Sequence, residues 1–190
     1  MPLFKIKQSG GPRDVELSMA GLKLGSKVLQ LHGRDSGLIA TLAGVAGLSG
    51  EACAVALDQP QAEAFERAAA AEGVLVEVTV APLSALPYDP ESFDLVVIKN
   101  MLGELRQNTR VACLQQAQRV LRAGGRCLVI EQAIRGGLGA LFSRQSLDRQ
   151  YATFGGARGA LKAEGFRGVR LLADRDGLSF TEGTRGAINE

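Results

Sequence analysis

The sequence contains no tryptophan, a single histidine and three cysteines, and these scarcities exclude several kinds of site. Cys53, Cys113 and Cys127 form no CxxC pair, and each lies among apolar residues. Zinc and iron–sulfur sites need clustered ligands, and a disulfide framework needs cysteines in pairs. We therefore expect no metal site, and three buried free thiols in a reducing compartment, the cytoplasm.

Long apolar runs and a strong net charge are also absent. The longest uncharged stretch, residues 36–50, is too short and too rich in glycine to cross a bilayer, and residues 1–11 lack the apolar core of a signal peptide. A net charge of +2 attracts no nucleic acid, and no zinc spacing, aromatic platform or long basic stripe is present. We expect a soluble protein without a nucleic-acid partner or a transmembrane segment. Peripheral attachment to a membrane or to a larger complex stays open.

Charge is distributed unevenly along the chain. Residues 51–100 carry nine acids and two bases, whereas residues 132–170 carry seven bases and two acids. One interpretation is two differently solvated faces, and the other is a basic docking surface for a protein partner within 132–170.

Apolar strand patterns alternate with helical ones along most of the chain. The pattern predicts strands at 27–31, 52–57, 74–80, 93–98 and 126–131, and helices at 15–22, 37–48, 61–71, 108–121 and 156–164. Such alternation is typical of one α/β domain, here 1–190, with a doubly wound, Rossmann-like and mostly parallel sheet. We expect residues 1–26 to form an N-terminal leader, in which the helix over 15–22 caps the sheet edge. The segments 168–174 and 177–182 end the chain as an antiparallel hairpin.

Two segments resemble a known family. Residues 86–105 (LPYDPESFDLVVIKNMLGEL) and 114–132 (LQQAQRVLRAGGRCLVIEQ) are similar to the regions around strands four and five of class I S-adenosylmethionine-dependent methyltransferases, of the ubiquinone/menaquinone-biosynthesis type. The resemblance covers roughly residues 20–182. It implies S-adenosylmethionine as cofactor and methyl transfer to a small, partly apolar molecule, with residues 132–155 as a lid-like insertion over the substrate.

The loop after the first strand departs from that family. The family has an acidic residue in the strand followed by roughly GxGxG, whereas this chain has Gln30 and then HGRDSG, which retains only Gly33 and Gly37. His32 and Arg34 add bulk, and Arg34 adds positive charge, where the family keeps space. Asp35 is our candidate to replace the missing carboxylate beside the methionine end of the cofactor.

The resemblance assigns the other cofactor contacts to three further places. Asp58, followed by Gln59, corresponds to the carboxylate that accepts from the ribose hydroxyls, and Lys99 ends the fourth strand at the same edge. The family's adenine-binding aspartate falls at Pro82, which offers neither a side-chain acceptor nor an N–H. Leu83 is expected to pack on the adenine ring. The lost contacts lower the expected affinity by several kcal/mol, at roughly 1–3 kcal/mol per buried polar contact.

Methyl transfer mainly requires positioning of two reactants, so its catalytic residues leave little trace in a sequence. The candidates are His32, as a general base, and Asn100 at the end of the fourth strand. Each has an alternative role in shaping its loop. Two functions therefore stay open, a small-molecule methyltransferase and a catalytically degenerate member that serves as a binding or scaffold subunit of a larger complex.

Overall fold

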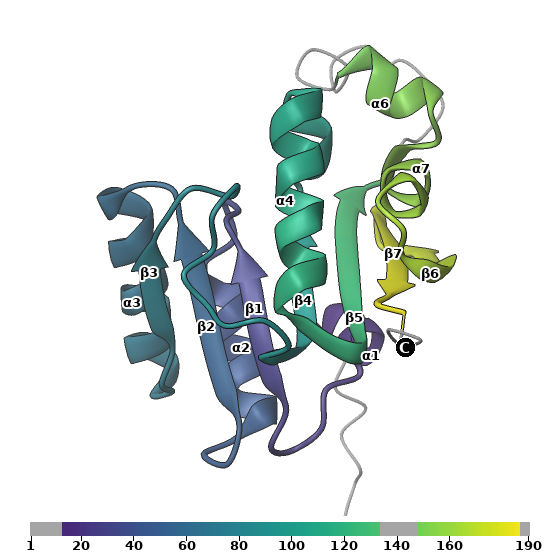
Figure 1. Ribbon diagram of the computed structural model, residues 1–190. Helices are drawn as coiled ribbons and strands as arrows, with labels where there is room; N and C mark the ends of the chain where they lie inside the picture. Colours follow the sequence, from purple (N-terminus) through teal and green to yellow (C-terminus); the bar gives the residue numbers. More distant parts are fainter. Residues whose placement is uncertain (1–12, 134–147, 187–190) are drawn as a thin grey trace, which may run out of the picture.

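A seven-stranded sheet in the order β3-β2-β1-β4-β5-β7-β6 organises the chain in the computed structural model, which describes residues 13–133 and 148–186 (Figure 1). The strands are β1 (Lys27–Leu31), β2 (Glu51–Ala56), β3 (Glu77–Val80), β4 (Phe93–Lys99), β5 (Leu121–Gln132), β6 (Arg167–Arg175) and β7 (Leu178–Thr184). Strands β1 to β5 pair in parallel, and β7 runs antiparallel to both of its neighbours. The predicted doubly wound sheet with a C-terminal hairpin is confirmed.

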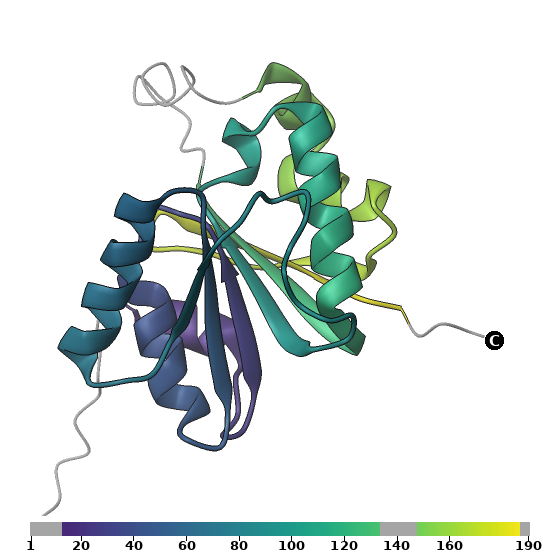
Figure 2. The same cartoon turned by 60° about the vertical axis from the view of Figure 1, so that its left-hand side comes forward.

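Helices cover both faces of this sheet (Figure 2). One layer contains α1 (Asp14–Ala20), α2 (Gly37–Ala46) and α3 (Gln59–Glu72), whose apolar side chains form one core with the sheet. The other contains α4 (Gln107–Val120) and α7 (Gly156–Ala163), and the short elements η1 (Leu102–Glu104) and α6 (Arg149–Thr153) lie beside it. Burial of the central strands on both faces explains their continuous apolar runs.

Some element boundaries differ from the predictions. The expected strand 74–80 begins only at Glu77, because β3 pairs with β2 from the Cys53–Glu77 register onwards. The helix predicted over 108–121 runs from Gln107 to Val120. Strand β5 then starts at Leu121, which pairs with Phe93 ahead of a register shift. The predicted lid-like insertion 132–155 falls mostly on residues 134–147, outside the described residues.

The three cysteines are buried and free, as predicted. Burial raises the pKa of each thiol, to about 12 for Cys53 and for Cys113. No helix among the described residues is long and apolar enough to span a membrane.

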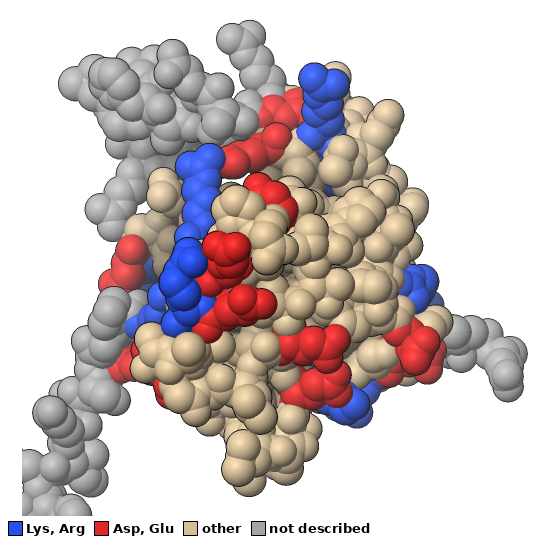
Figure 3. All heavy atoms as spheres, turned by 90° about the vertical axis from the view of Figure 1, so that its left-hand side faces the viewer, with Lys and Arg blue, Asp and Glu red and all other residues tan. Residues whose placement is uncertain are grey.

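Acidic and basic side chains gather at opposite ends of the sheet, the acidic ones at β3 and the basic ones at β6. Figure 3 shows the side formed by α3 and β3, where Glu63, Glu66, Glu72 and Glu77 are exposed. At the other end, the exposed bases of α7 and β6 include Arg158, Lys162, Arg167 and Arg170. We call this second group the basic end.

Candidate functional site

The strand order reverses between β1 and β4, and the loops that leave the carboxyl ends of these strands form the edge where doubly wound sheets bind ligands. Two non-glycine residues here have a left-handed backbone, His32 (φ 40°) after β1 and Asn100 (φ 49°) after β4. Such conformations cluster at functional loops. Gly33 (φ 120°) lies so close to β4 that a Cβ would be 3.3 Å from the Lys99 carbonyl oxygen. The absence of a side chain at Gly33 thus allows the backbone of β4 to approach closely.

Four charged side chains meet at this edge and form what we call the charge quartet, Arg13, Glu16, Asp35 and Lys99. The Arg13 guanidinium binds the Asp35 carboxylate through two hydrogen bonds of 2.8 and 3.0 Å. The Lys99 ammonium donates to Asp35 Oδ2 at 2.5 Å and also to Glu16 Oε1. The side chains of Lys99 and Glu16 are only 10% and 3% exposed. Two cations and two anions alternate, so the quartet is electrically neutral and fixes the N-terminal end of α1 to the end of β4.

The quartet uses the Asp35 carboxylate that was our candidate for the cofactor's ammonium group. Both of its oxygens already accept hydrogen bonds from cations of this chain. Arg13 also lies against the open side of Gly37, because a Cβ there would be 2.6 Å from its Nη2 atom. The methionine end of S-adenosylmethionine, which carries an ammonium and a carboxylate, does not fit the quartet as it stands.

Arg34 extends into solvent from the loop after β1. Its side chain is 86% exposed and pairs at 3.6 Å with Glu104 of η1, the short helix that follows β4. The positive charge near Asp35 comes instead from Arg13 and Lys99.

Gln30 occupies the family's acidic position and is fully buried. Its amide nitrogen donates to the Asp35 carbonyl at 3.0 Å, which shapes the loop from within. Its Oε1 atom is buried and has no hydrogen-bond partner among the described residues. Gln30 therefore supplies a neutral acceptor where a carboxylate would supply charge.

His32 is bound to a residue that the sequence did not single out. Its Nδ1 atom lies 2.5 Å from Oε1 of Gln61, which also accepts the Leu57 N–H at 3.0 Å. The Gln61 amide nitrogen donates to the Gly33 carbonyl at 3.1 Å. Because an amide oxygen only accepts, Nδ1 is the donor and the neutral ring keeps Nε2 as its basic nitrogen. This bridge between the loops after β1 and β2 supports the loop-shaping role of His32.

The predicted ribose and adenine residues occupy separate surroundings. Asp58 is exposed and caps α3, since its Oδ1 atom accepts the Gln61 N–H at 2.9 Å, and Gln59 is exposed in the same turn. Leu83 is only 3% exposed and packs in the core, while Pro82 is exposed beside it. The residues assigned to ribose are thus accessible, and the one assigned to adenine is covered.

A second polar cluster lies near the carboxyl end of β5. The buried Arg110 donates to the carbonyls of Leu102 and Leu105 and to Asp148 Oδ2, and its guanidinium lies 4.7 Å from the centre of the Tyr151 ring. Tyr151 donates to Glu131 Oε1 at 2.6 Å. Burial raises the pKa of Glu131, although the tyrosine hydrogen bond opposes the shift. This cluster fixes α6 against η1 and α4.

Glu51, Cys53 and Glu77 form another group, in which one ligand atom of each residue lies within 4.8 Å of the others. Glu51 pairs with the Lys27 ammonium at 2.7 Å. The Cys53 thiol donates to Glu51 Oε1 at 3.6 Å, so both oxygens of this carboxylate are bound by groups of the chain itself.

The quartet makes stability depend on pH. Burial alone would raise the pKa of Asp35, but hydrogen bonds from Arg13 and Lys99 outweigh it and lower the pKa from 3.8 to about 2. Because the folded pKa lies below the unfolded one, the carboxylate stabilises the fold above about pH 4, and this contribution disappears as the pH falls towards about 2. We expect Asp35→Asn to lose less stability than the wild type between about pH 6 and about pH 3 in urea unfolding. Equal losses in the two proteins would contradict the pairing.

Comparisons with known proteins agree with the fold. A family model described as a methyltransferase domain matches residues 33–129. The ubiquinone/menaquinone biosynthesis C-methyltransferase of Cupriavidus necator is 25% identical over 115 residues, which are 60% of this chain and 46% of that protein. This chain therefore aligns with less than half of that relative.

Solved structures give a similar result. A S-adenosylmethionine-dependent methyltransferase from Aquifex aeolicus superposes with a TM-score of 0.74 at 17% identity, covering 92% of this chain and 89% of the other. The [4+2]-cyclase SpnF superposes with a TM-score of 0.59 at 20% identity, covering 84% of this chain and 56% of the other. At these identities the likeness shows the fold alone.

Proposed function

Since the chain belongs to the methyltransferase-domain family, we propose that it is a member that has lost efficient binding of S-adenosylmethionine and serves as a binding subunit of a larger assembly. The charge quartet carries this proposal. A cofactor with a zwitterionic end would have to displace Arg13 or Lys99 from Asp35 and so break an ion pair of the quartet.

The cost of that displacement decides the affinity. Breaking a buried ion pair costs about 3–5 kcal/mol, and tenfold in affinity corresponds to about 1.4 kcal/mol. A micromolar ligand, bound with about −8 kcal/mol, would become a ligand of roughly millimolar affinity. The neutral Gln30 and the replacement of the adenine acceptor by Pro82 weaken the site further.

One further observation supports a binding role. The basic end, with Arg158, Lys162, Arg167 and Arg170 exposed, offers a surface for an acidic protein partner. Arg135 and Arg144 of the proposed basic surface lie outside the described residues. We place the protein in the cytoplasm, where its three free thiols would stay reduced.

A small-molecule methyltransferase is the second candidate. The buried Oε1 of Gln30, which has no partner within the described part of the chain, favours it. A buried acceptor without a donor is costly, and a ligand that donates to the β1 loop would satisfy it. In this alternative, Asp58 would bind ribose, the loop 33–37 would bind the methionine end, and the substrate would be small and partly apolar.

Titration of the purified protein with S-adenosylhomocysteine by calorimetry separates the two functions. The proposed binding subunit gives no saturable heat below millimolar ligand. Micromolar binding that Asp58→Ala abolishes, while Glu66→Ala at an exposed position of α3 leaves it unchanged, would instead establish the methyltransferase site.

A further inference from the structure

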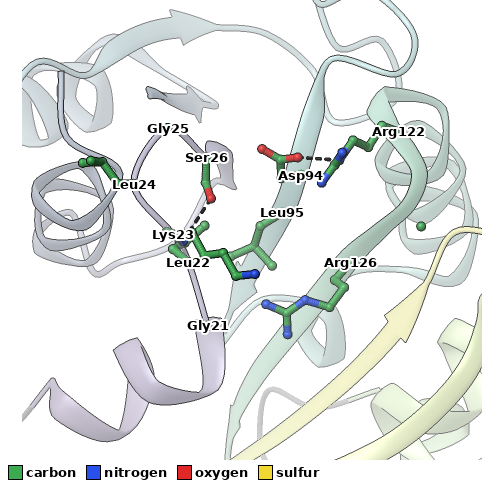
Figure 4. Close-up of a pocket in the computed structure, with 11 residues that line it drawn as sticks. Gly21, Leu22, Lys23, Leu24, Gly25, Ser26, Asp94, Leu95, Arg122 and Arg126 are labelled. Carbon is green, nitrogen blue, oxygen red and sulfur yellow. Dashed lines mark hydrogen bonds and ion pairs between the residues drawn. The ribbon is translucent and has the colours of Figure 1, made fainter. Parts of the chain in front are cut away.

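A cavity of about 400 Å³ lies at the opposite edge of the sheet, where β1 and β4 begin (Figure 4). Its walls are the loop 21–26 between α1 and β1, the first residues of β4, and Arg122, Gly124 and Arg126 of β5. The volume lies within the range of pockets that hold small organic ligands, about 300–1,000 Å³. We call it the amino-edge recess.

The recess is lined by three cations and one acid. The acid, Asp94, is already engaged, since one oxygen pairs with Arg122 Nε and the other accepts the Lys27 N–H at 2.7 Å. In Figure 4 the side chains of Lys23 and Arg126 extend into the same space from opposite walls. No acidic side chain within 13–133 or 148–186 pairs with the Lys23 ammonium.

The wall behind Arg126 adds to this excess of positive charge. Arg126 Nη1 binds Glu182 Oε2 at 2.9 Å, and Arg170 binds the other oxygen of the same carboxylate at 2.7 Å. One buried carboxylate thus neutralises two guanidinium groups only in part. Arg126 is held in place by a second hydrogen bond to the Ala20 carbonyl at the end of α1. Its approach depends on Gly21, where a Cβ would be 3.2 Å from Nη2.

We propose that the amino-edge recess binds the phosphate group of a small phosphorylated molecule between Lys23 and Arg126. Arginine guanidinium and lysine ammonium groups both bind phosphate oxygens in proteins. An anion between them would remove the repulsion between two facing cations. The remaining volume, along Leu22, Leu95 and the backbone of the loop, would hold the organic part of the ligand. The recess lies at the amino ends of β1 and β4, whereas the charge quartet lies at their carboxyl ends. This proposal therefore does not depend on the proposed function.

Backbone amide NMR of the full chain tests the site with inorganic phosphate and with glycerol 3-phosphate as probes. We expect saturable shifts of the amides of Lys23, Gly25, Ser26 and Gly124 with both probes, and tighter binding of glycerol 3-phosphate. Lys23→Gln should weaken both probes about tenfold, corresponding to the loss of one charge-assisted contact. Arg67→Gln, which removes an exposed cation of α3 far from the recess, should leave the affinities unchanged.

The outcomes separate three cases. Equal affinity for the two probes would show that the recess does not bind the organic part of a ligand and is a site for free phosphate only, which would overturn the proposed class of ligand. Shifts that map elsewhere, or equal affinities of Lys23→Gln and the wild type, would overturn the site altogether. Lys23 is exposed, so its replacement leaves the fold intact and a loss of shifts reports on binding.

Discussion

Replacement of Lys99 by methionine is expected to lower the free energy of unfolding by about 3–5 kcal/mol. The Lys99 ammonium is the cation shared by Glu16 and Asp35. Methionine fills a similar volume but leaves the buried Glu16 carboxylate without its closest cation. Arg13 compensates only in part, because its contact with Glu16 is 3.4 Å long. Urea unfolding at neutral pH measures the change.

Lys27→Met is the matched control. Like Lys99, Lys27 lies on a parallel strand of the sheet and pairs with a glutamate, in this case Glu51. Its side chain, however, is 53% exposed. Exposed ion pairs contribute about 0–1 kcal/mol, so this variant should be nearly as stable as the wild type. Equal effects of the two substitutions would show that the quartet is an ordinary surface network. Glu16→Gln in the Lys99→Met background should recover part of the lost stability, because it removes the uncompensated charge.

Arg110→Met is expected to cost about 3 kcal/mol of unfolding free energy and to loosen α6 selectively. The guanidinium donates hydrogen bonds to two backbone carbonyls and to Asp148. One hydrogen bond to a charged group contributes about 1.5–3 kcal/mol, and the contributions of neighbouring bonds do not simply add, so the total stays near the upper end of this range. Its contact with the Tyr151 ring would also be lost. Hydrogen exchange should therefore accelerate most at residues 149–153.

Arg67→Met provides the comparison for this second variant. Arg67 lies on α3, is 69% exposed and contacts Glu63 one turn earlier at 3.6 Å. We expect a change of less than about 0.5 kcal/mol and unaltered exchange in α6. If Arg110→Met behaves in the same way, the polar cluster of Arg110, Asp148 and Tyr151 does not hold α6 in place.

The sheet was predictable from the sequence because its strands are apolar runs bounded by glycine and helical segments. The predicted strand 27–31 coincides with β1, and the predicted 93–98 differs from β4 by one residue. The strand prediction was wrong for residues 74–76. Alternating apolar residues indicate which side chains are buried, but they do not show whether the backbone is hydrogen-bonded to a neighbouring strand. Val74 and Val76 do pack against the core, ahead of the pairing that starts at Glu77.

The charge quartet was not predictable, although two of its members were singled out. Asp35 and Lys99 were assigned to a cofactor, and no local pattern links them to Arg13 and Glu16 of the leader. Glu16 and Lys99 are 83 residues apart in sequence. Only the packing of α1 against the sheet brings their charges together. Gln61 was missed for a similar reason, since an α3 glutamine is ordinary until its amide is seen bridging two loops.

In the proposed binding subunit, Lys99 holds the place that a cofactor's ammonium group would need. NMR detection of the Lys99 side-chain ¹⁵NH₃⁺ group tests it directly, with Lys99→Met to assign the signal. We predict a slowly exchanging ammonium signal that millimolar S-adenosylhomocysteine leaves unchanged, because Glu16 and Asp35 continue to hold the group. A saturable shift of that signal with added ligand, or its loss to rapid exchange, would show that the ligand displaces Lys99 and would contradict the proposed loss of cofactor binding.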